Sequence, residues 1–345
     1  MERNLFSLEA AIQYGQPMQV LGYIMTKYNM NNFETIYHYT DINGFISIIQ
    51  NREFWLSHMR FMNDRKEYLE GKELLKKIID DLLLNDDGTF DDLLRKVLEI
   101  LDEEVLEGNW GRSSEDVFSL SLSHSRDSLD MWRGYGRNSG IAIGLDIHAC
   151  MELPGMCMVR KEQYEDDLKQ CGNKPEKMWP HNERLLLARN VLYDDEKKEE
   201  ILLEILNITL EHYKYLKTKK VGWAEESALD CITKTLFDIF PYLKNKGFKN
   251  ENECRFVENL VYSKGEVPLK VYYRERNGLV LPYIKYVLLD LNCRPLKKWP
   301  IKEIVIGPGL KQNDVVESVR FFLKHQGLND LVEKVVTSDI PYVAV

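Results

Sequence analysis

The stretch ETIYHYTDINGFISIIQNREFWLSH, residues 34–58, decides the fold, because it predicts a strand, a capped helix and a second strand in direct succession. Residues 34–40 have the pattern of a strand, with Tyr37-His38-Tyr39-Thr40 at its polar end. Asp41 is well placed to cap the helix that follows. Residues 53–58 predict the second strand. The region opens a β-α-β unit directly beside a polar patch.

Outward from this unit, helices and strands occur in blocks. We expect helices near 5–14, 18–28, 75–82, 94–105, 194–217, 224–243 and 313–325, and strands near 117–123, 139–146, 253–262, 269–274, 279–289, 301–306 and 335. Because these blocks do not alternate strictly, they predict an α+β fold rather than a doubly wound sheet.

The helical blocks suggest a domain organisation. Residues 1–32 form an N-terminal helical extension, and residues 33–345 form a single α+β domain with helical insertions at about 65–107 and 194–244. The Leu and Ile stripes of the insertions are explained by packing against the body of the protein. The alternatives are a surface that recognises a target and an interface of a homo-oligomer.

Composition narrows the class of protein. The chain has 345 residues, of which 44% are hydrophobic and 29% charged, as in globular proteins. Its net charge of −9 disfavours generic nucleic-acid binding. No apolar run is long enough to cross a bilayer, and no basic stretch leads into an apolar one at the N-terminus. Six scattered cysteines without zinc spacing predict reduced thiols in a cytoplasmic protein, with no metal.

His38 is the first candidate for a functional residue. The simpler interpretation is a structural histidine at the end of a strand. However, Thr40 shares its side of the strand, since residues two apart point the same way. The pair offers hydrogen-bond donors and acceptors that suit a ribose diol. Tyr37 and Tyr39 point the other way or flank this pair, and one of them is a candidate to lie under a flat ring.

Three further motifs carry aromatic or polar side chains. In Phe54-Trp55-Leu56-Ser57-His58, an aromatic residue either packs on the core or forms one wall of a ring-binding slot. Residues 63–68 predict a helix cap that leads to Tyr68. Trp132 and Tyr135 lie three apart before a glycine-rich turn and are best explained by core packing. Residues 117–123 alternate large apolar residues with hydroxyls, which predicts a strand with one polar face.

Glu253 lies in the late motif Asn252-Glu253-Cys254-Arg255-Phe256. On a strand, Glu251, Glu253 and Arg255 share one face. Such a pattern is usually a solvated face or a salt bridge, and this interpretation prevails if the motif is considered alone.

Together these patches resemble a bacterial domain-of-unknown-function family, family 2971, in the right order over residues 33–340. The resemblance is carried by residues 37–40, 61–67, 118–121, 131–135, 140–144, 251–255, 281–283 and 304–308. The chain departs from the family at Arg65, where Pro is common, and at Cys254, where Trp is common.

That family in turn resembles the ADP-ribosyltransferases more distantly, through a split antiparallel β-core, a first-strand His and a late-strand Glu. The resemblance implies NAD as co-substrate, with His38 and Glu253 in catalysis and His38 and Thr40 on the ribose. It also implies Tyr39, Trp55 or Tyr68 near nicotinamide. Arg255 and Glu251 would support Glu253, and Arg274 or Arg276 would reach the pyrophosphate. These roles require His38 and Glu253 to line a common cleft.

The resemblance leaves three functions open. The first is transfer of ADP-ribose to an unknown macromolecule, protein or nucleic acid, within phage defence or a toxin system. The second is an NAD glycohydrolase, in which water replaces the acceptor. The third is a catalytically silent module that binds a nucleotide or a partner.

Overall fold

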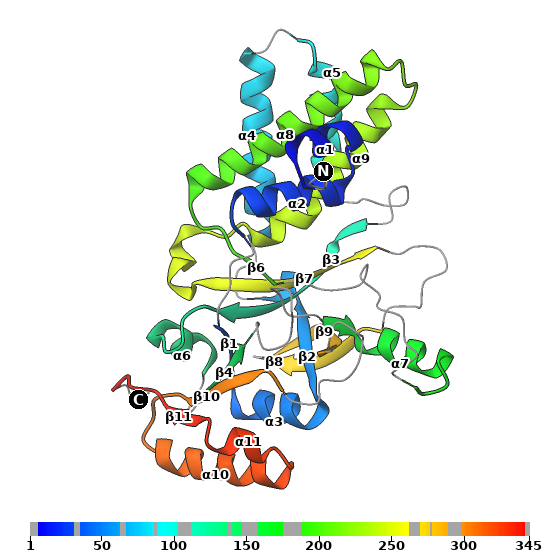
Figure 1. Cartoon of the computed structure of the whole chain (residues 1–345). Coiled ribbons are helices and arrows are strands. Elements are labelled where there is room, and N and C mark those ends of the chain that lie inside the picture. The colour runs from blue at the N-terminus through cyan, green and yellow to red at the C-terminus, as the bar shows by residue number, and fades with distance from the viewer. Residues whose placement is uncertain are drawn as a thin grey trace.

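The computed structural model shows a sheet between two groups of helices (Figure 1). The structure describes residues 6–30, 35–62, 67–85, 88–102, 112–136, 140–146, 158–174, 188–261, 270–276, 278–288 and 299–341. None of the helices within these ranges is long and apolar enough to span a membrane.

The strands within these ranges form one open sheet. They are β1 (Thr35–Thr40), β2 (Glu53–His58), β3 (Arg112–Ser123), β4 (Ile141–Asp146), β5 (Met158–Arg160), β6 (Ala188–Asn190), β7 (Glu253–Val261), β8 (Tyr272–Arg276), β9 (Leu279–Leu288), β10 (Ile301–Ile306) and β11 (Val335–Thr337). The main order is β11-β10-β4-β1-β3-β2-β9-β5, with β7 on β3, β6 on β7 and β8 on β9. Of these pairings β10–β11 is parallel and the others are antiparallel.

The centre of the sheet is β3, which three strands share. β7 runs along one edge of β3, from the pair Val117–Asn259 to the pair Ser123–Glu253. β1 and β2 therefore share the other edge, because a strand has only two. β1 meets β3 at Ser123, whereas β2 meets it at Ser119 and Phe118. The two strands thus separate along β3, and the term "the split" refers here to the region between them.

One group of helices covers one face of the sheet (top of Figure 1). It contains α1 (Leu8–Tyr14), α2 (Pro17–Lys27), α4 (Glu67–Asn85), α5 (Asp91–Asp102), α8 (Asp195–Thr218) and α9 (Ala224–Ile239). Their buried side chains form one apolar cluster, which also takes in Val117 and Val257 of the sheet. The N-terminal helices and the helices of both predicted insertions therefore share a single core.

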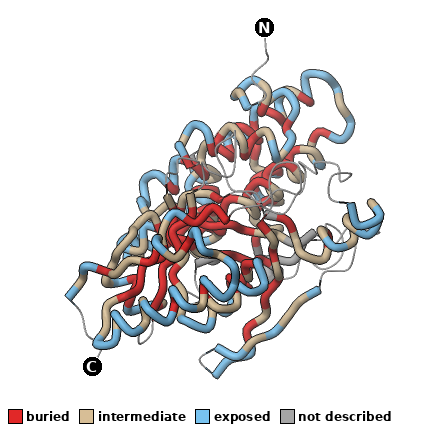
Figure 2. Tube along the Cα trace, turned by 60° about the horizontal axis from the view of Figure 1, so that its bottom comes forward, coloured by how far each residue is buried: buried red, intermediate tan, exposed pale blue. Residues whose placement is uncertain are grey.

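The other face packs on α3 (Ile42–Asn51), α10 (Gln312–His325) and α11 (Asn329–Val332). This cluster contains Phe45 of α3 and Leu323 of α10 together with Phe54 and Leu120 of the sheet. Figure 2 shows the buried residues running along the strands, with exposed residues on the outer helices. Alternate residues of β3 thus face two separate cores, with Val117 in the helical cluster and Phe118, Leu120 and Leu122 in the other.

The structure confirms the predicted β-α-β opening. β2 has the bounds that the sequence predicts, and the Asp41 side chain accepts a hydrogen bond from the Gly44 backbone N–H, 2.8 Å away, at the start of α3. The mixed α+β class and a mostly antiparallel sheet are also confirmed. The sequence analysis did not anticipate α7 (Lys161–Gln170) or the short strands β5 and β6.

Candidate functional site

His38 lies at the split. Its Nδ1 is 3.1 Å from the backbone oxygen of Ser121, and since a carbonyl only accepts, Nδ1 carries the proton. The ring packs edge-on against Phe54 of β2, with centroids 5.9 Å apart. Burial, helped by the charges of Arg274 and Arg276, lowers the pKa of His38 to about 4. The imidazole is therefore neutral at physiological pH, with an unprotonated Nε2.

Thr40 lies on the same side of β1 as His38 and is half-buried. Its hydroxyl sits over the first turn of α3, so closely that a Cβ at Gly44 would come within 2.1 Å of the Thr40 Oγ1. The glycine at this position is thus explained by the close approach of the threonine.

Tyr39 points to the opposite side of β1 and is buried. Its hydroxyl donates to the backbone oxygen of Ser125 at 2.8 Å and accepts from the backbone N–H of Ser128 at 3.2 Å. Its ring packs on Trp132 of α6 (Leu129–Tyr135), with centroids 4.6 Å apart. Tyr39 is therefore separated from His38 by the strand that carries both.

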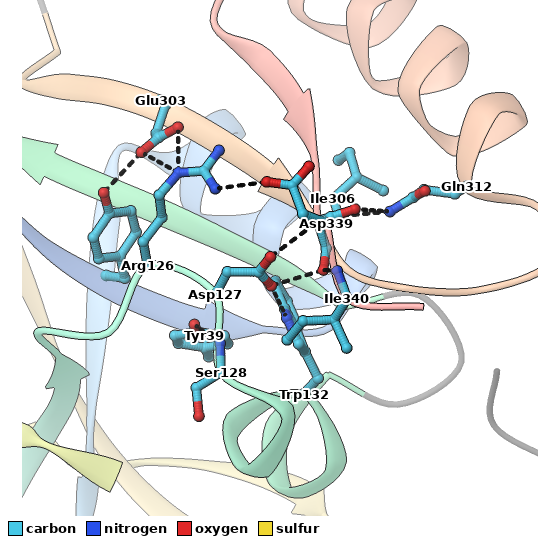
Figure 3. Close-up of polar contacts among 12 residues, drawn as sticks. Tyr39, Arg126, Asp127, Ser128, Trp132, Glu303, Ile306, Gln312, Asp339 and Ile340 are labelled. Carbon is cyan, nitrogen blue, oxygen red and sulfur yellow. Dashed lines mark hydrogen bonds and ion pairs between the residues drawn. The ribbon is translucent and has the colours of Figure 1, made fainter. Parts of the chain in front are cut away.

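A polar network covers this side of β1 (Figure 3). The Trp132 indole donates to Asp127 at 2.6 Å, and Ser338 donates to the same carboxylate at 2.7 Å. Glu303 accepts from Arg126 at 3.0 Å and from Tyr37 at 2.7 Å. Core packing of Trp132 is thus confirmed, because its ring is buried and its one donor is used.

Trp55 belongs to a stack of aromatic and cationic side chains on β2, β8 and β9. Its ring stacks on Tyr283 at 4.4 Å, and Arg274 and Lys285 lie 5.4 Å and 5.7 Å from its centroid. Its indole N–H donates to Glu53 at 2.9 Å. This arrangement is consistent with the prediction that Trp55 forms one wall of a ring-binding slot.

The Glu53 carboxylate contacts two members of that stack, Trp55 and Lys285. It is buried, and it accepts from Lys161 at 2.8 Å and lies 3.0 Å from the Lys285 ammonium. Burial raises its pKa, but the hydrogen bonds from Lys161, Trp55 and Lys285 outweigh this effect, so that the pKa of Glu53 is lowered.

Glu253 is held in a buried ion cluster, named here the Glu253 cluster, which consists of Lys244, Glu251, Glu253 and Arg255. Arg255 donates to both Glu253 oxygens, at 2.6 Å and 2.7 Å, and Lys244 donates at 2.8 Å. Glu253 and Arg255 are only 3% and 0% exposed. Burial opposes ionisation, yet the charges of Arg255 and Lys244 hold the pKa of Glu253 well below its usual range.

The rest of this cluster ties β7 to its surroundings. Arg255 also donates to the backbone oxygen of Pro241 in η5 (Phe240–Tyr242), at 2.7 Å. Lys244 donates to Glu251 at 2.7 Å, and Tyr135 of α6 lies 3.5 Å from the other Glu251 oxygen. The salt bridge that the spacing of Glu253 and Arg255 predicts is therefore present.

The structure does not bring His38 and Glu253 together, contrary to the expectation that they line a common cleft. Tyr37 pairs with Ser123, and Ser123 pairs with Glu253, so these three side chains share one face of the sheet. His38 alternates with Tyr37 and points to the other face. β3 also lies between β1 and β7. Which face each of the two side chains occupies depends on how β1 and β7 pair with β3. Neither the His38 motif nor the Glu253 motif contains residues of β3.

Arg274 is the residue that joins His38 to the Trp55 stack. Its Nη2 donates to the Ser57 hydroxyl at 2.8 Å, and its charge acts on His38 across the split. From the sequence, Arg274 is only an alternative to Arg276, and Ser57 is not a candidate. Two features of the sequence could have indicated these residues. One is the hydroxyl of Ser57 next to the aromatic residues of 53–58, and the other is the pair of arginines within residues 272–276.

The structure does not test the predictions for Tyr68 and for the helix cap before it. The side chain of Tyr68 and the proposed cap at residues 63–66 fall outside the described residues. Within the described part of the chain, no three His, Cys, Asp or Glu side chains are grouped so as to hold a metal ion.

Comparison with known proteins gives one match. No curated protein and no solved structure matches the chain. Residues 131–256 match the model of a family described as a protein of unknown function, DUF2971. This segment is less than half of the chain and contains the motifs at Trp132 and Glu253, so the chain is similar over this segment to the domain-of-unknown-function family that its motifs resemble.

Proposed function

We propose that the protein takes NAD as co-substrate, cleaves the nicotinamide–ribose bond and transfers ADP-ribose to a macromolecular acceptor. The observation that carries the proposal is the split, with His38 on β1, the Trp55–Tyr283 stack on the opposite face of β2 and β9, and Arg274, whose charge acts on His38, beside that stack. A split antiparallel core with a first-strand His is the feature by which the chain resembles ADP-ribosyltransferases. The likeness is one of motif and architecture and supports a hypothesis about function.

The side chains at the split suit the parts of a dinucleotide. The neutral His38 ring has an unprotonated Nε2 that can accept a hydrogen bond from a ribose hydroxyl. The Trp55 face can stack on a flat ring, and Arg274 can bind a phosphate group. Arg255 would act through Glu253, which it keeps ionised.

Loss of nicotinamide leaves positive charge on the ribose ring, as in glycoside cleavage. An ionised carboxylate stabilises such charge where it develops, commonly by about 3–4 kcal/mol. Glu253 is the carboxylate that the resemblance implies, and Arg255 keeps it charged. Two features weigh against this role of Glu253. The register of β1, β3 and β7 places it on the face of the sheet opposite His38, and both of its oxygens are already engaged by Arg255 and Lys244.

That engagement favours a second candidate, a catalytically silent module that binds a nucleotide at the split. A carboxylate with both oxygens in charge-assisted bonds, and almost no exposed surface, is typical of a structural ion pair. In this case the groups at the split bind the ligand, and Glu253 only holds β7 against the helices. An NAD glycohydrolase is the variant of the first proposal in which water is the acceptor.

The test is release of nicotinamide from labelled NAD by the purified chain, alone and with cell extract. Glu253→Gln should abolish release in the enzyme. The matched control is Glu303→Gln, because Glu303 on β10 also pairs with an arginine, Arg126, but in the separate network that contains Tyr37. Thermal unfolding of both variants reports whether the fold is kept.

The outcomes separate the candidates. Release that is lost in Glu253→Gln and kept in Glu303→Gln supports the enzyme, and free ADP-ribose without a modified target identifies the glycohydrolase. NAD binding without release supports the silent module. Release that is unchanged in a folded Glu253→Gln variant contradicts the proposed role of Glu253.

A further inference from the structure

The outer edge of β8 has no partner strand among the described residues. β8 pairs with β9 along its whole length, from the pair Tyr272–Tyr283 to the pair Arg276–Leu279, and no described strand pairs with its other side. Edge strands of this kind present backbone amides and carbonyls with which another chain can pair. The name "the β8 edge" refers here to the side of residues 272–276 that faces away from β9.

The register of the hairpin indicates which backbone groups face outward. Tyr273 lies opposite Pro282, which has no N–H, so a hydrogen-bonded pair at this position would lack one of its two bonds. The hydrogen-bonded pairs are therefore those on either side, at Tyr272 and Arg274. Because the two kinds of pair alternate, the N–H and C=O groups of Tyr273 and Glu275 point away from β9, toward the β8 edge.

One face of the hairpin presents apolar surface beside this edge. Tyr273 and Glu275 lie on that face together with Pro282 and Val280, their partners on β9. Tyr273 is 65% exposed and Val280 is 70% exposed. A strand that added to the β8 edge would therefore place alternate side chains next to exposed apolar groups.

The other face, named here the cationic face, carries positive charge. Arg274 and Arg276 lie two apart on β8, and Lys270, just before the strand, has its ammonium 4.8 Å from the centroid of the Tyr272 ring. Lys270 and Arg276 are exposed, and neither has an ion pair with another described residue. The Tyr272 hydroxyl donates to Glu162 at 2.7 Å, so this carboxylate is already engaged. Carboxylates of an added strand would find free cations here.

The same cations argue against a second copy of the chain as the occupant. Because the outward groups belong to Tyr273 and Glu275, two antiparallel copies of β8 can pair only in registers that differ by two residues. Full overlap sets Arg274 opposite Arg274 of the other copy. A shift of two residues sets either Arg274 or Lys270 opposite Arg276. Like charges directly opposite each other destabilise a strand pair.

We propose that the β8 edge binds an extended acidic segment of a partner protein, which adds to the sheet as a further antiparallel strand. The residues of this segment that lie opposite Tyr273 and Glu275 bond to the outward backbone groups and carry apolar side chains. The residues between them carry carboxylates toward the cationic face. This interaction is additional to the proposed function, because it requires neither NAD nor its cleavage.

The first test is fluorescence anisotropy of the full chain with a short labelled peptide in which Val and Glu alternate. In the proposed complex, the Val residues of the peptide lie opposite Tyr273 and Glu275, so their N–H groups bond to β8 and those of the Glu residues point away. Methylation of the Val amide nitrogens should therefore abolish binding, whereas methylation of the Glu amide nitrogens should leave it unchanged. The two methylated probes have the same charge and the same side chains, so each is the control for the other.

Variants of the chain test the backbone and the charge separately. Tyr273→Pro removes an outward N–H but no bond to β9, and it should weaken binding of the unmethylated peptide by at least about tenfold. Lys270→Glu combined with Arg276→Glu should weaken it by at least about tenfold at low salt, and by less at high salt. The matched control is Lys311→Glu combined with Lys324→Glu, which changes the net charge equally at the two ends of α10.

Thermal unfolding shows whether each variant keeps its fold, and the methylated probes carry the test if Tyr273→Pro does not fold. Binding that only Val methylation and the changes on β8 remove supports the proposal. If the peptide does not bind, if both methylated probes bind alike, or if a folded Tyr273→Pro variant binds as the wild type does, no strand is added and the proposal is wrong. A dimer in sedimentation that Tyr273→Pro dissociates would assign the β8 edge to a second copy and would also overturn it.

Discussion

Two groups of polar side chains lie next to each other on the sheet. One is the Glu253 cluster, and the other consists of Ser57, Ser119, Ser121 and Arg274, since Arg255 pairs with Ser121 and Ser57 pairs with Ser119. Both bury a guanidinium, but they differ in how it is satisfied. Arg255 has two carboxylate oxygens and a backbone oxygen as partners, whereas Arg274 has one serine hydroxyl. A guanidinium in this fold is therefore either fully engaged by its neighbours, as Arg255 is, or keeps a donor without a partner among the described residues, as Arg274 does.

The largest effect should come from breaking the satisfied cluster. Arg255→Met leaves Glu253 buried with Lys244 as its one charged donor within the described residues, and it removes the donor to Pro241. We expect the free energy of unfolding to fall by about 3–5 kcal/mol, measured by urea denaturation. Arg126→Met, in the more exposed pair with Glu303, should cost no more than about 1 kcal/mol. Equal costs would contradict the structural role of Arg255.

Two serines on β3 provide the sharpest comparison. The Ser123 hydroxyl donates to the backbone oxygen of Glu251 at 2.6 Å and accepts from the Ser125 N–H at 3.0 Å, so Ser123→Ala should cost about 1–3 kcal/mol. Ser119→Ala removes a hydroxyl that has no partner in the described part of the chain, so it should leave stability unchanged or raise it by up to about 1 kcal/mol. Urea unfolding measures both. A cost for Ser119→Ala as large as for Ser123→Ala would show that its hydroxyl is satisfied.

The third comparison uses pH. The pKa of His38 is lowered from its ordinary value of 6.5 to about 4, so the unfolded chain takes up a proton before the folded chain does. The contribution of neutral His38 to the free energy of unfolding is fully present above pH 6.5. It is lost as pH falls from 6.5 toward 4, by up to about 1.4 kcal/mol per pH unit. The pKa of Glu253 is lowered from 4.5, so its contribution is lost only below that pH.

His38→Gln distinguishes the pH range of the His38 contribution from that of Glu253, because the amide of Gln can donate to the backbone oxygen of Ser121 but does not titrate. Stability curves from pH 7 to 5 should fall less steeply for this variant than for the wild type. If the two curves are parallel, His38 is already protonated in the fold or is exposed to water.

Local signals in the sequence were sufficient for the elements around the site. The strand at 53–58 and the Asp41 cap are confirmed because each depends on a few adjacent residues. The missed strands β5 and β6 have three residues each, too few for an alternating pattern.

Which side chains meet was harder to predict, because it depends on the pairing of distant strands. The faces of His38 and Glu253 are related through β3, and a shift of one residue in either pairing would exchange them. The alternating hydroxyls of residues 117–123 were visible in the sequence. That Ser123 is satisfied and Ser119 is not follows only from the partners that the fold supplies.

The position of β3 also has a consequence for biosynthesis. Its first neighbours precede it in the chain, whereas β7, which pairs with its other edge from Val117 to Ser123, is made much later. Until residues 253–261 leave the ribosome, β3 must present a row of free backbone amides and carbonyls flanked by Phe118, Leu120 and Leu122, a template for wrong pairing. Nascent chains that stall before β7 should therefore be the form of this protein that most needs a chaperone.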